Sequence, residues 1–320
     1  MELKADEINP EPNLSGRDFL TLADYSGVEL LYILETAHEL KEKQKSGISY
    51  QPLKGKTLGM IFEKASTRTR VSFETGIYQL GGMGLFLSSD DIQMGRGEPI
   101  SDTAKVLSGY LDGIMIRTFS QKTVEELAEN ASIPVINGLT DLYHPCQVLA
   151  DFQTIQEAKG NLKNVKLAYI GDGNNVAHSL MLGAAIIGMD ISIAAPVEYQ
   201  PDYAVIQQAK AIAAKNGSKV EITEDPVRAA RNADAIYTDV WASMGQEQEQ
   251  KIREQQFADF QVNKKLLSHA AKDAIFMHCL PAHRGEEVSA EVIDGKQSVV
   301  FLQAENRLHA QKALMLALMG

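Results

Sequence analysis

The chain has 320 residues, of which 44% are hydrophobic and 23% charged, the balance of a globular protein with one large domain or two ordinary ones. Its formal net charge of −11 argues against a nucleic-acid partner, which needs clustered lysine and arginine, but a few local cations can still bind a small anion. The two cysteines, Cys146 and Cys279, exclude a disulfide scaffold and lack zinc-site spacing, so we expect a reducing compartment.

The segment 1–14 is acidic and contains no apolar stretch, which is not the pattern of a signal or transit peptide. No apolar run approaches the ~18–20 residues that cross a membrane. We therefore expect a cytoplasmic protein with no membrane partner.

Short apolar runs alternate with amphipathic stretches, which is typical of a βαβ protein with buried parallel strands. In the first half, leucines at helical spacing predict a helix at 28–45, and the run 57–62 predicts a buried strand. The polar segment 63–70 then leads into a helix that ends near residues 81–82. Further strands are expected at 84–87, 113–117 and 134–138, and helices at 101–110 and 124–130.

A longer helix is predicted at 145–157, and we interpret it as a bridge between two domains. The alternation then begins again. Strands are expected at 165–171, 190–194, 220–222, 235–240 and 274–278, and helices at 175–188, 203–215 and 305–319.

The predicted fold is α/β, with two domains that each hold a parallel β-sheet flanked by helices, and with an active-site cleft between the domains. The first domain is expected to span 1–149 and to be joined by the C-terminal helix at about 305–320, and the second to span 150–304. Ligands bind at the carboxyl ends of parallel strands, and every polar cluster described below comes at the end of a predicted strand.

The segment Ser66–Arg70 (STRTR) follows the strand at 57–62 and begins a helix. The N–H groups of a first helical turn have no internal partner, and the helix dipole is positive there. Three hydroxyl side chains and the planar fork of Arg68 add donors that match a phosphate group. A capped helix with a solvated basic turn is the structural alternative, but hydroxyls interleaved with two arginines favour a phosphate site.

His144 stands at the entrance of the helix at 145–157, because Pro145 favours the first helical turn. Its imidazole can donate a hydrogen bond to a polarised carbonyl oxygen, and the amide oxygen of Gln147 can bind a substrate –NH2 group. Arg117 ends the strand at 113–117 and can place a cation beside the same oxygen. Alone, each of these residues would more often be structural.

The segment Asp239–Gly245 (DVWASMG) lies at the end of the strand at 235–240. A carboxylate there can hold an ammonium group, and the Ser-Met-Gly turn offers a hydroxyl and free N–H groups for a carboxylate. Together they suit an α-amino acid, although an aspartate that ends a strand before a loop is the plainer interpretation.

Cys279 lies at the end of the strand at 274–278, beside the polar run 283–287. A free cysteine is usually a small buried hydrophobe, but this position favours a functional thiol. Pro281 predicts an extended conformation for Leu280.

Two weaker signals remain. Gly171–Asn175 (GDGNN) is placed like a dinucleotide-binding loop, but Val176 replaces the third glycine of that motif, so the asparagines are expected to bind a small polar substrate instead. Arg307 follows the start of the last predicted helix and is either a surface charge or a residue that reaches into the cleft.

In this order and spacing, the segments 62–70, 144–147, 239–245 and 278–287 resemble the carbamoyltransferase family, and the resemblance covers the chain from about Gly16 onward. STRTR with HPCQ is specific for the family, and SMG with HCLP resembles its ornithine branch. The resemblance implies transfer of the carbamoyl group of carbamoyl phosphate to the δ-amine of L-ornithine, giving citrulline and phosphate. It also implies a homo-oligomer, at least a trimer, with no cofactor or metal; arginine biosynthesis is the expected pathway, although breakdown is equally compatible with the residues.

The resemblance further implies roles for individual residues. Arg117 and His144 would act on the carbamoyl oxygen, Gln147 would hold the carbamoyl nitrogen, and Cys279 would meet the reacting amine as a thiolate or through its backbone carbonyl. The carbamoyl phosphate site would comprise Ser66, Thr67, Arg68, Thr69, Gln93, Arg117, His144, Gln147, Cys279, Leu280 and Arg307, and the ornithine site Asn175, Asp239, Ser243 and Met244.

Three alternatives stay open at this point. The acceptor amine could be putrescine or a modified ornithine. A non-catalytic sensor of a phosphorylated metabolite would keep the phosphate site but would not need His144, Gln147 and Cys279 together. A dinucleotide-dependent dehydrogenase would rest on Gly171–Asn175 alone.

Overall fold

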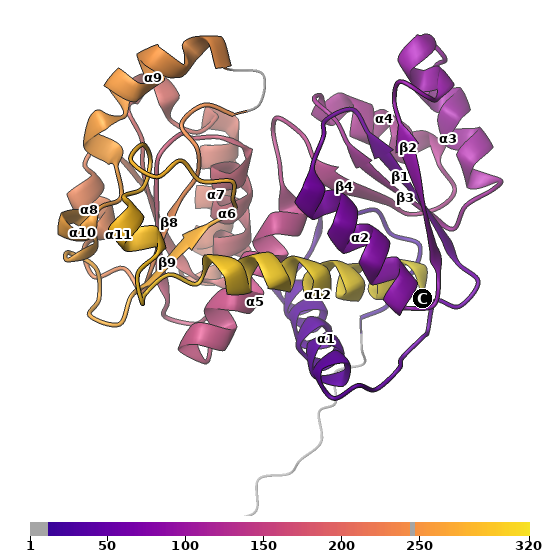
Figure 1. The fold of residues 1–320 in the computed structure, drawn as a ribbon, viewed down its shortest axis with the longest axis horizontal. Helices are drawn as coiled ribbons and strands as arrows, with labels where there is room; N and C mark the ends of the chain where they lie inside the picture. Colours follow the sequence, from indigo (N-terminus) through magenta and orange to yellow (C-terminus); the bar gives the residue numbers. More distant parts are fainter. Residues whose placement is uncertain (1–11, 244–246) are drawn as a thin grey trace, which may run out of the picture.

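A computed structural model of the chain describes residues 12–243 and 247–320. The described chain forms two lobes, each built on one parallel sheet (Figure 1). Two helices, α5 (Pro145–Lys159) and α12 (Val300–Met319), run between the lobes and pack against each other. The predicted α/β class with two parallel sheets flanked by helices is therefore confirmed.

The sheet of the first lobe has the order β2-β1-β3-β4, and all its neighbours are parallel. The chain reverses its direction of winding between β1 and β3, so the carboxyl ends of these two strands form a topological switch point. The elements of this lobe are η1 (Leu22–Asp24), α1 (Gly27–Lys45), β1 (Thr57–Phe62), α2 (Thr67–Gln79), β2 (Met83–Ser88), η2 (Gln93–Arg96), α3 (Ile100–Ser108), β3 (Gly113–Arg117), α4 (Gln121–Asn130) and β4 (Val135–Leu139).

The sheet of the second lobe has the order β7-β6-β5-β8-β9, again with parallel neighbours, and its switch point lies between β5 and β8. Its strands are β5 (Lys166–Ile170), β6 (Asp190–Ala194), β7 (Val220–Thr223), β8 (Ala235–Thr238) and β9 (Ile275–His278). Its helices and 3-10 turns are α6 (Asn175–Ile187), η3 (Val197–Tyr199), α7 (Tyr203–Asn216), α8 (Pro226–Ala230), η4 (Glu247–Glu249), α9 (Gln250–Gln256), η5 (Ala258–Phe260), α10 (Lys264–Leu267) and α11 (Ala290–Ile293).

Local sequence signals explain where the main helices begin and end. Ser26 forms a capping box with Glu29 at the start of α1, and the Ser66 hydroxyl accepts from the Thr69 N–H at 3.2 Å to cap α2. Gly160 and Gly188 end α5 and α6 in the left-handed conformation, with φ of +83° and +85°. Because α2 and α6 start shortly after β1 and β5, the N–H groups of their first turns lie at the carboxyl ends of these strands.

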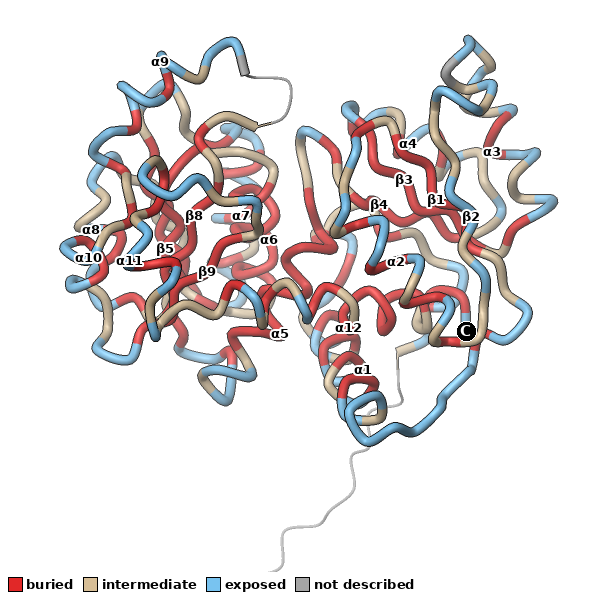
Figure 2. The backbone as a smooth tube through the Cα atoms, in the orientation of Figure 1, coloured by how far each residue is buried: buried red, intermediate tan, exposed pale blue. Residues whose placement is uncertain are grey.

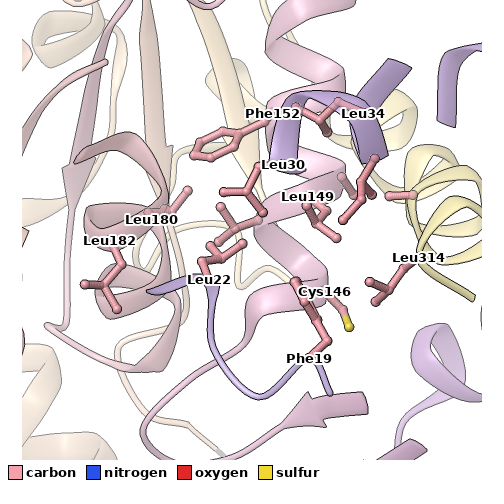
Figure 3. Packing of buried hydrophobic residues seen from close by; sticks show 14 of the residues in the cluster. Phe19, Leu22, Leu30, Leu34, Cys146, Leu149, Phe152, Leu180, Leu182 and Leu314 are labelled. Carbon is pink, nitrogen blue, oxygen red and sulfur yellow. The ribbon is translucent and has the colours of Figure 1, made fainter. Parts of the chain in front are cut away.

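The largest apolar cluster joins the two lobes. It brings together η1, α1, α5, α6 and α12, and Figure 3 shows Leu30, Phe152, Leu180 and Leu314 packed within it. Figure 2 shows the same pattern along the chain, with buried segments in the inner strands of both sheets and where α1, α5 and α12 meet. Because α12 packs against α1 and α2 as well as α5, the last helix is part of the first lobe's core. The predicted division after residue 149 falls inside α5 and stays a prediction.

The predicted strands agree with the observed ones to within two residues at each end. The last helix begins at Val300 instead of near residue 305, so Arg307 lies about two turns inside the helix and not at its start. The short helices α8, α9, α10 and α11 were not predicted, because none has room for two turns of apolar periodicity. Within the described ranges, no helix has the length and apolar character needed to cross a membrane.

Candidate active site

A cleft of about 840 Å³ lies between the lobes, at the carboxyl ends of β1, β3, β5 and β8. Both topological switch points open onto it, which is where parallel sheets commonly bind ligands. The predicted site residues that line the cleft are Ser66, Arg68, Thr69, Arg117, His144, Gln147, Asn175, Asp239, Ser243, Cys279, Leu280 and Arg307. Residues from seven separate segments of the sequence are thus brought to one place.

Three predicted site residues are not placed in this lining. Thr67 is exposed in the first turn of α2, and Gln93 is exposed in η2. Met244 lies outside the described residues. The roles assigned to these three residues stay predictions.

Three guanidinium groups, those of Arg68, Arg117 and Arg307, reach the cleft from α2, β3 and α12. Burial, followed by the charges of Arg307 and Arg68, lowers the pKa of Arg117 to about 10. Within the described residues the Nε atom of Arg117 has no hydrogen-bond partner. Buried like charges that lack a counter-ion are destabilising, so this end of the cleft is built to receive an anion.

Arg307 is held in the cleft by neutral acceptors. It is 3% exposed, and its guanidinium donates to the amide oxygen of Gln147 at 2.6 Å and to the Thr69 hydroxyl at 3.2 Å. When the Gln311 amide is oriented with its oxygen toward Arg307, it accepts two further hydrogen bonds at 2.9 and 3.1 Å. Its hydrogen-bond partners are all neutral, so Arg307 adds to the positive field at this end of the cleft, which the buried Asp151 carboxylate reduces when it is ionised.

Gln147 was predicted to read a substrate –NH2 group through its amide oxygen. In the structure this oxygen already accepts from Arg307, and the amide nitrogen donates to Asp151 at 2.9 Å. An amide oxygen has two lone pairs, so one remains for a substrate N–H. Asp151 was not predicted, and it has no signal of its own in the sequence.

His144 is buried at the start of α5, and its Nδ1 has no partner among the described residues. Burial and the charges of Arg307, Arg117 and Arg68 lower the pKa of His144 well below its ordinary value. The lowered pKa favours the neutral imidazole, which can donate one hydrogen bond without adding another positive charge. Its backbone N–H donates to the Ser179 hydroxyl of α6 at 2.8 Å, which ties the two lobes together beside the site.

Asp239 lines the cleft from the second lobe, directly after β8. One carboxylate oxygen accepts from the Val240 N–H at 2.8 Å and from the Cys279 thiol at 2.9 Å, and the other accepts from the Asn174 amide at 2.8 Å. Asn174 also caps α6, with its oxygen 3.0 Å from the Val176 N–H. Asn174 was not predicted individually, although an asparagine directly before the predicted helix at 175–188 was a signal for a capping role.

The surroundings of Cys279 favour its protonated thiol, which lies 2.9 Å from a carboxylate oxygen of Asp239. Burial, and then the charge of Asp239 and its hydrogen bond to the thiol, raise the pKa of Cys279 well above its ordinary value. Both predicted roles of Cys279, as a thiolate or through its backbone carbonyl, stay predictions, and the raised pKa favours the carbonyl.

Leu280 departs from the extended conformation that Pro281 was expected to impose. Its φ is +58°, in the left-handed region that a non-glycine residue adopts at a cost of about 1–3 kcal/mol. In this conformation its N–H donates to His278 Nδ1 at 2.8 Å. His278 Nε2 in turn lies 3.0 Å from the buried Glu287 carboxylate, so a fixed pair of side chains holds the turn.

The loop Gly171–Asn175 serves packing and positioning. A Cβ atom on Gly173 would lie 2.2 Å from the Pro201 nitrogen, so the glycine is required by contact with a neighbouring loop and not by a bound pyrophosphate. Asn175 donates to the Thr140 carbonyl at 2.5 Å and links α6 to the loop after β4. This packing removes the one feature on which the dehydrogenase interpretation rested.

Asp239, His278 and Cys279 present three potential metal-ligand atoms within 4.8 Å of one another. Both nitrogens of His278 already have partners, Leu280 N–H and Glu287. A cation would have to displace one of these contacts, so the arrangement is better explained as a support for the turn at Leu280.

Comparison with known proteins covers nearly the whole chain. Residues 17–157 match the carbamoyl-P binding domain of aspartate/ornithine carbamoyltransferases, and residues 163–318 match the Asp/Orn binding domain. An ornithine carbamoyltransferase from Oceanobacillus iheyensis is 68% identical over 321 residues, 100% of each chain, and an anabolic one from Pyrococcus furiosus is 56% identical over 308 residues, 96% of this chain and 98% of its own. The solved structure of ornithine carbamoyltransferase from Pyrococcus furiosus superposes with a TM-score of 0.94 at 56% identity, covering 97% of this chain and 99% of that one.

Proposed function

The chain belongs to the aspartate/ornithine carbamoyltransferase family, and we propose that it transfers the carbamoyl group of carbamoyl phosphate to the δ-amine of L-ornithine, giving L-citrulline and phosphate. The observation that carries the proposal is the division of charge in one cleft. Arg68, Arg117 and Arg307 line it from one side, and Asp239 lines it from the second lobe. The first set fits a phosphate dianion and the second fits an ammonium group.

The phosphate of the substrate is assigned to the start of α2. There the free N–H groups of the first turn, the Ser66 and Thr69 hydroxyls and the Arg68 guanidinium converge on the cleft. A leaving group whose charge is stabilised before the reaction needs less activation during it. This end of the site therefore both binds carbamoyl phosphate and prepares phosphate to depart.

The carbamoyl oxygen is assigned to Arg117 and His144. Attack on the carbamoyl carbon gives a tetrahedral intermediate with a negative oxygen, and a guanidinium and a neutral imidazole can both donate to it. The remaining lone pair of the Gln147 oxygen would accept from the carbamoyl –NH2 group and fix the orientation of the carbon.

The attacking amine must lose a proton before it reacts. An alkylamine with a pKa of ~10.4 is neutral in only about one molecule in a few thousand at neutral pH, which corresponds to about 4–5 kcal/mol. Neighbouring cations such as Arg117 favour the neutral amine. Asp239, with Asn175 and Ser243, would hold the amino-acid end of ornithine, while the Cys279 carbonyl and Leu280 would face the δ-amine.

A colorimetric assay for citrulline tests the function directly. Carbamoyl phosphate and ornithine are expected to give citrulline, and putrescine supplied in competition is expected to remain largely unreacted because it lacks the α-carboxylate and α-ammonium groups. Faster carbamoylation of putrescine would assign the chain to that substrate instead. If neither amine is carbamoylated although carbamoyl phosphate binds, the non-catalytic sensor becomes the better account.

We further propose that the protein assembles as a homotrimer. The edge strand β2 carries Met83, Leu85 and Phe86 exposed at 54%, 38% and 38%, beside exposed Val71 and Tyr78 of α2. Exposed apolar side chains on a sheet edge favour a protein contact. Light scattering is expected to give about three times the 35.1 kDa mass of one chain, and a monomer at micromolar concentration would contradict the assembly.

We place the reaction in arginine biosynthesis in the cytoplasm. The Pyrococcus furiosus relative is named as anabolic, and both cysteines of this chain are free thiols, as a reducing compartment favours. Expression in a bacterial host that lacks its own ornithine carbamoyltransferase is expected to restore growth without arginine. Citrulline formation in vitro without restored growth would argue for another pathway.

A further inference from the structure

Asp151 is a buried carboxylate that the proposed mechanism does not use. It lies on α5, one turn after Gln147, is 0% exposed, and is not among the residues that line the cleft. Its Oδ1 accepts two hydrogen bonds, from the Gln147 amide at 2.9 Å and from the Gln303 amide at 2.7 Å. Its Oδ2 has no hydrogen-bond partner among the described residues. A buried carboxylate with one unsatisfied oxygen is costly, and its presence needs an explanation.

The contact with Gln147 determines which way the Gln147 amide faces. Because the amide nitrogen donates to Asp151, the amide oxygen is turned toward Arg307, from which it accepts at 2.6 Å. Rotation of the amide by half a turn would point its –NH2 group at the guanidinium, where donor would meet donor. The same oxygen is the one assigned to the carbamoyl nitrogen.

The contact with Gln303 reaches the other side of the site. The Gln303 oxygen accepts from the backbone N–H of His278 at 2.9 Å, and its nitrogen lies 3.1 Å from the Tyr237 hydroxyl. His278 directly precedes Cys279, so this chain of hydrogen bonds ends at the backbone that is assigned to the reacting amine. One oxygen of Asp151 is thus shared between the carbamoyl side and the amine side.

We propose that Asp151 is a positioning residue for carbamoyl transfer, which fixes the amide orientations of Gln147 and Gln303. It thereby fixes the position of the Gln147 oxygen, assigned to the carbamoyl group, relative to the backbone of His278 that precedes Cys279. The proposal rests on the proposed function but adds a residue that touches neither substrate. In this role Asp151 acts on the reaction through the two glutamines.

Electrostatics give Asp151 a second, measurable link to the anion site. Burial raises the pKa of Asp151 to about 7, against the opposing effects of its two amide donors, of Arg307 and of the nearby Tyr237 hydroxyl. The charged and titratable groups that sense it are Arg307 on α12, the Cys279 thiol after β9 and the Tyr237 phenol on β8. As pH rises through about 7, ionisation of Asp151 weakens the positive field of Arg307, so an anion should bind less tightly.

A double-mutant cycle tests the positioning role through kcat/KM for carbamoyl phosphate. We expect Asp151→Ala to lower kcat/KM by about tenfold or more in the native background, and by less than about threefold when Gln147 is already alanine. Asp273→Ala removes an exposed aspartate that pairs with Lys159 and is the matched control, expected to leave kcat/KM unchanged. Equal losses in both backgrounds would overturn the proposal, because Asp151 would not act through Gln147.

Asp151→Asn keeps the oxygen that accepts both amides and removes the charge, so it answers the question if the alanine variant fails to fold. Sulfate, a dianion throughout, is titrated by calorimetry at pH of about 6 and about 8. The native protein is expected to lose several-fold more sulfate affinity over this interval than Asp151→Asn, and the same loss in both would overturn the link. Citrulline formation by the native protein is measured separately, and its absence would refute the proposed function. If citrulline forms normally but the effects of the Asp151 and Gln147 substitutions on kcat/KM are additive, only the positioning role is refuted.

Discussion

Arg117 on the first lobe and Asp239 on the second are both buried charged groups of the same cleft, but their surroundings differ. The Nε atom of Arg117 has no partner among the described residues, and its nearest charged neighbours include Arg307 and Arg68. Asp239 accepts from Asn174, from the Val240 N–H and from the Cys279 thiol. Arg117 therefore lies among like charges, whereas Asp239 receives all of these hydrogen bonds from neutral donors.

This difference has consequences for binding and catalysis. An anion that enters the first half relieves repulsion between buried cations, so it gains more than it loses in water. An ammonium that enters the second half replaces neutral donors already in place, so its net gain is smaller. Substitutions in the half of the cleft that contains Arg117 are therefore expected to have larger effects than substitutions in the half that contains Asp239.

Arg68→Gly is expected to have the largest effect. Removing one guanidinium from the phosphate site should lower turnover by at least about 100-fold, with an unchanged far-UV circular dichroism spectrum. Steady-state kinetics give the measurement, and Arg228→Gly, which removes an exposed arginine paired with Glu221, is the control. Near-normal turnover of Arg68→Gly would show that Arg68 does not hold the phosphate, and would contradict the difference expected between the two halves of the cleft.

Asp239→Asn is expected to come next. It should raise KM for ornithine about 10- to 100-fold, because a hydrogen bond to a charged group is lost, and should change KM for carbamoyl phosphate by less than about threefold. Initial rates with each substrate varied in turn separate the two effects. Equal increases in both KM values would show that the two halves do not divide the substrates.

Asn174→Ala should have a smaller effect on the same half. The variant lacks the amide that donates to Asp239, so KM for ornithine should rise about fivefold. Loss of the helix cap should cost about 1 kcal/mol of stability and lower the melting temperature by a few degrees. Asp202→Ala removes the comparable cap of α7, where Asp202 accepts from the Ala204 N–H at 2.8 Å. An equal rise in KM for both variants would show that Asn174 acts only as a cap.

The titration of His144 is expected to show the smallest change. Because burial and three arginines lower its pKa, its ring should stay neutral as pH falls to about 5.5, below the ordinary histidine pKa of ~6.5. The fold favours neutral His144, so its contribution to stability is present above that ordinary value and is lost as pH falls toward the lowered pKa. Nitrogen chemical shifts, with His144→Gln to identify the resonance, measure the charge. A protonated His144 ring at that pH would show that the positive field of the three arginines around it is weaker than we infer.

The sequence predicted the strands and the placement of the polar clusters well, because both depend on local pattern. The run 58–62 is apolar throughout, and 190–194 is apolar apart from Asp190 and Ser192, so both are recognisable as buried parallel strands from local pattern alone. The clusters at Ser66 and Asp239 follow such strands directly, and the ends of parallel strands meet at one edge of a sheet. The cleft and most of its lining follow from these two facts.

The parts that could not be predicted depend on partners far away in the sequence. Asn174 contacts Asp239 across 65 positions, and Arg307 contacts Gln147 across 160. In the sequence nothing distinguishes Asp151 from other helical aspartates, because its partner Gln303 lies 152 positions away. The left-handed Leu280 depends on the ring of His278 to accept its N–H. No local periodicity encodes these pairings, because they exist only once the two lobes have assembled.

The position of Arg307 on α12 has a consequence for the order of folding. The first lobe is made early in synthesis and has its own sheet, but its anion site lacks one guanidinium until α12 has been made and has packed against α1, α2 and α5. Because α12 follows the entire second lobe in the chain, a nascent first domain that folds alone would have incomplete affinity for carbamoyl phosphate. The capacity for catalysis should therefore appear only after α12 has been made and has packed against the first lobe.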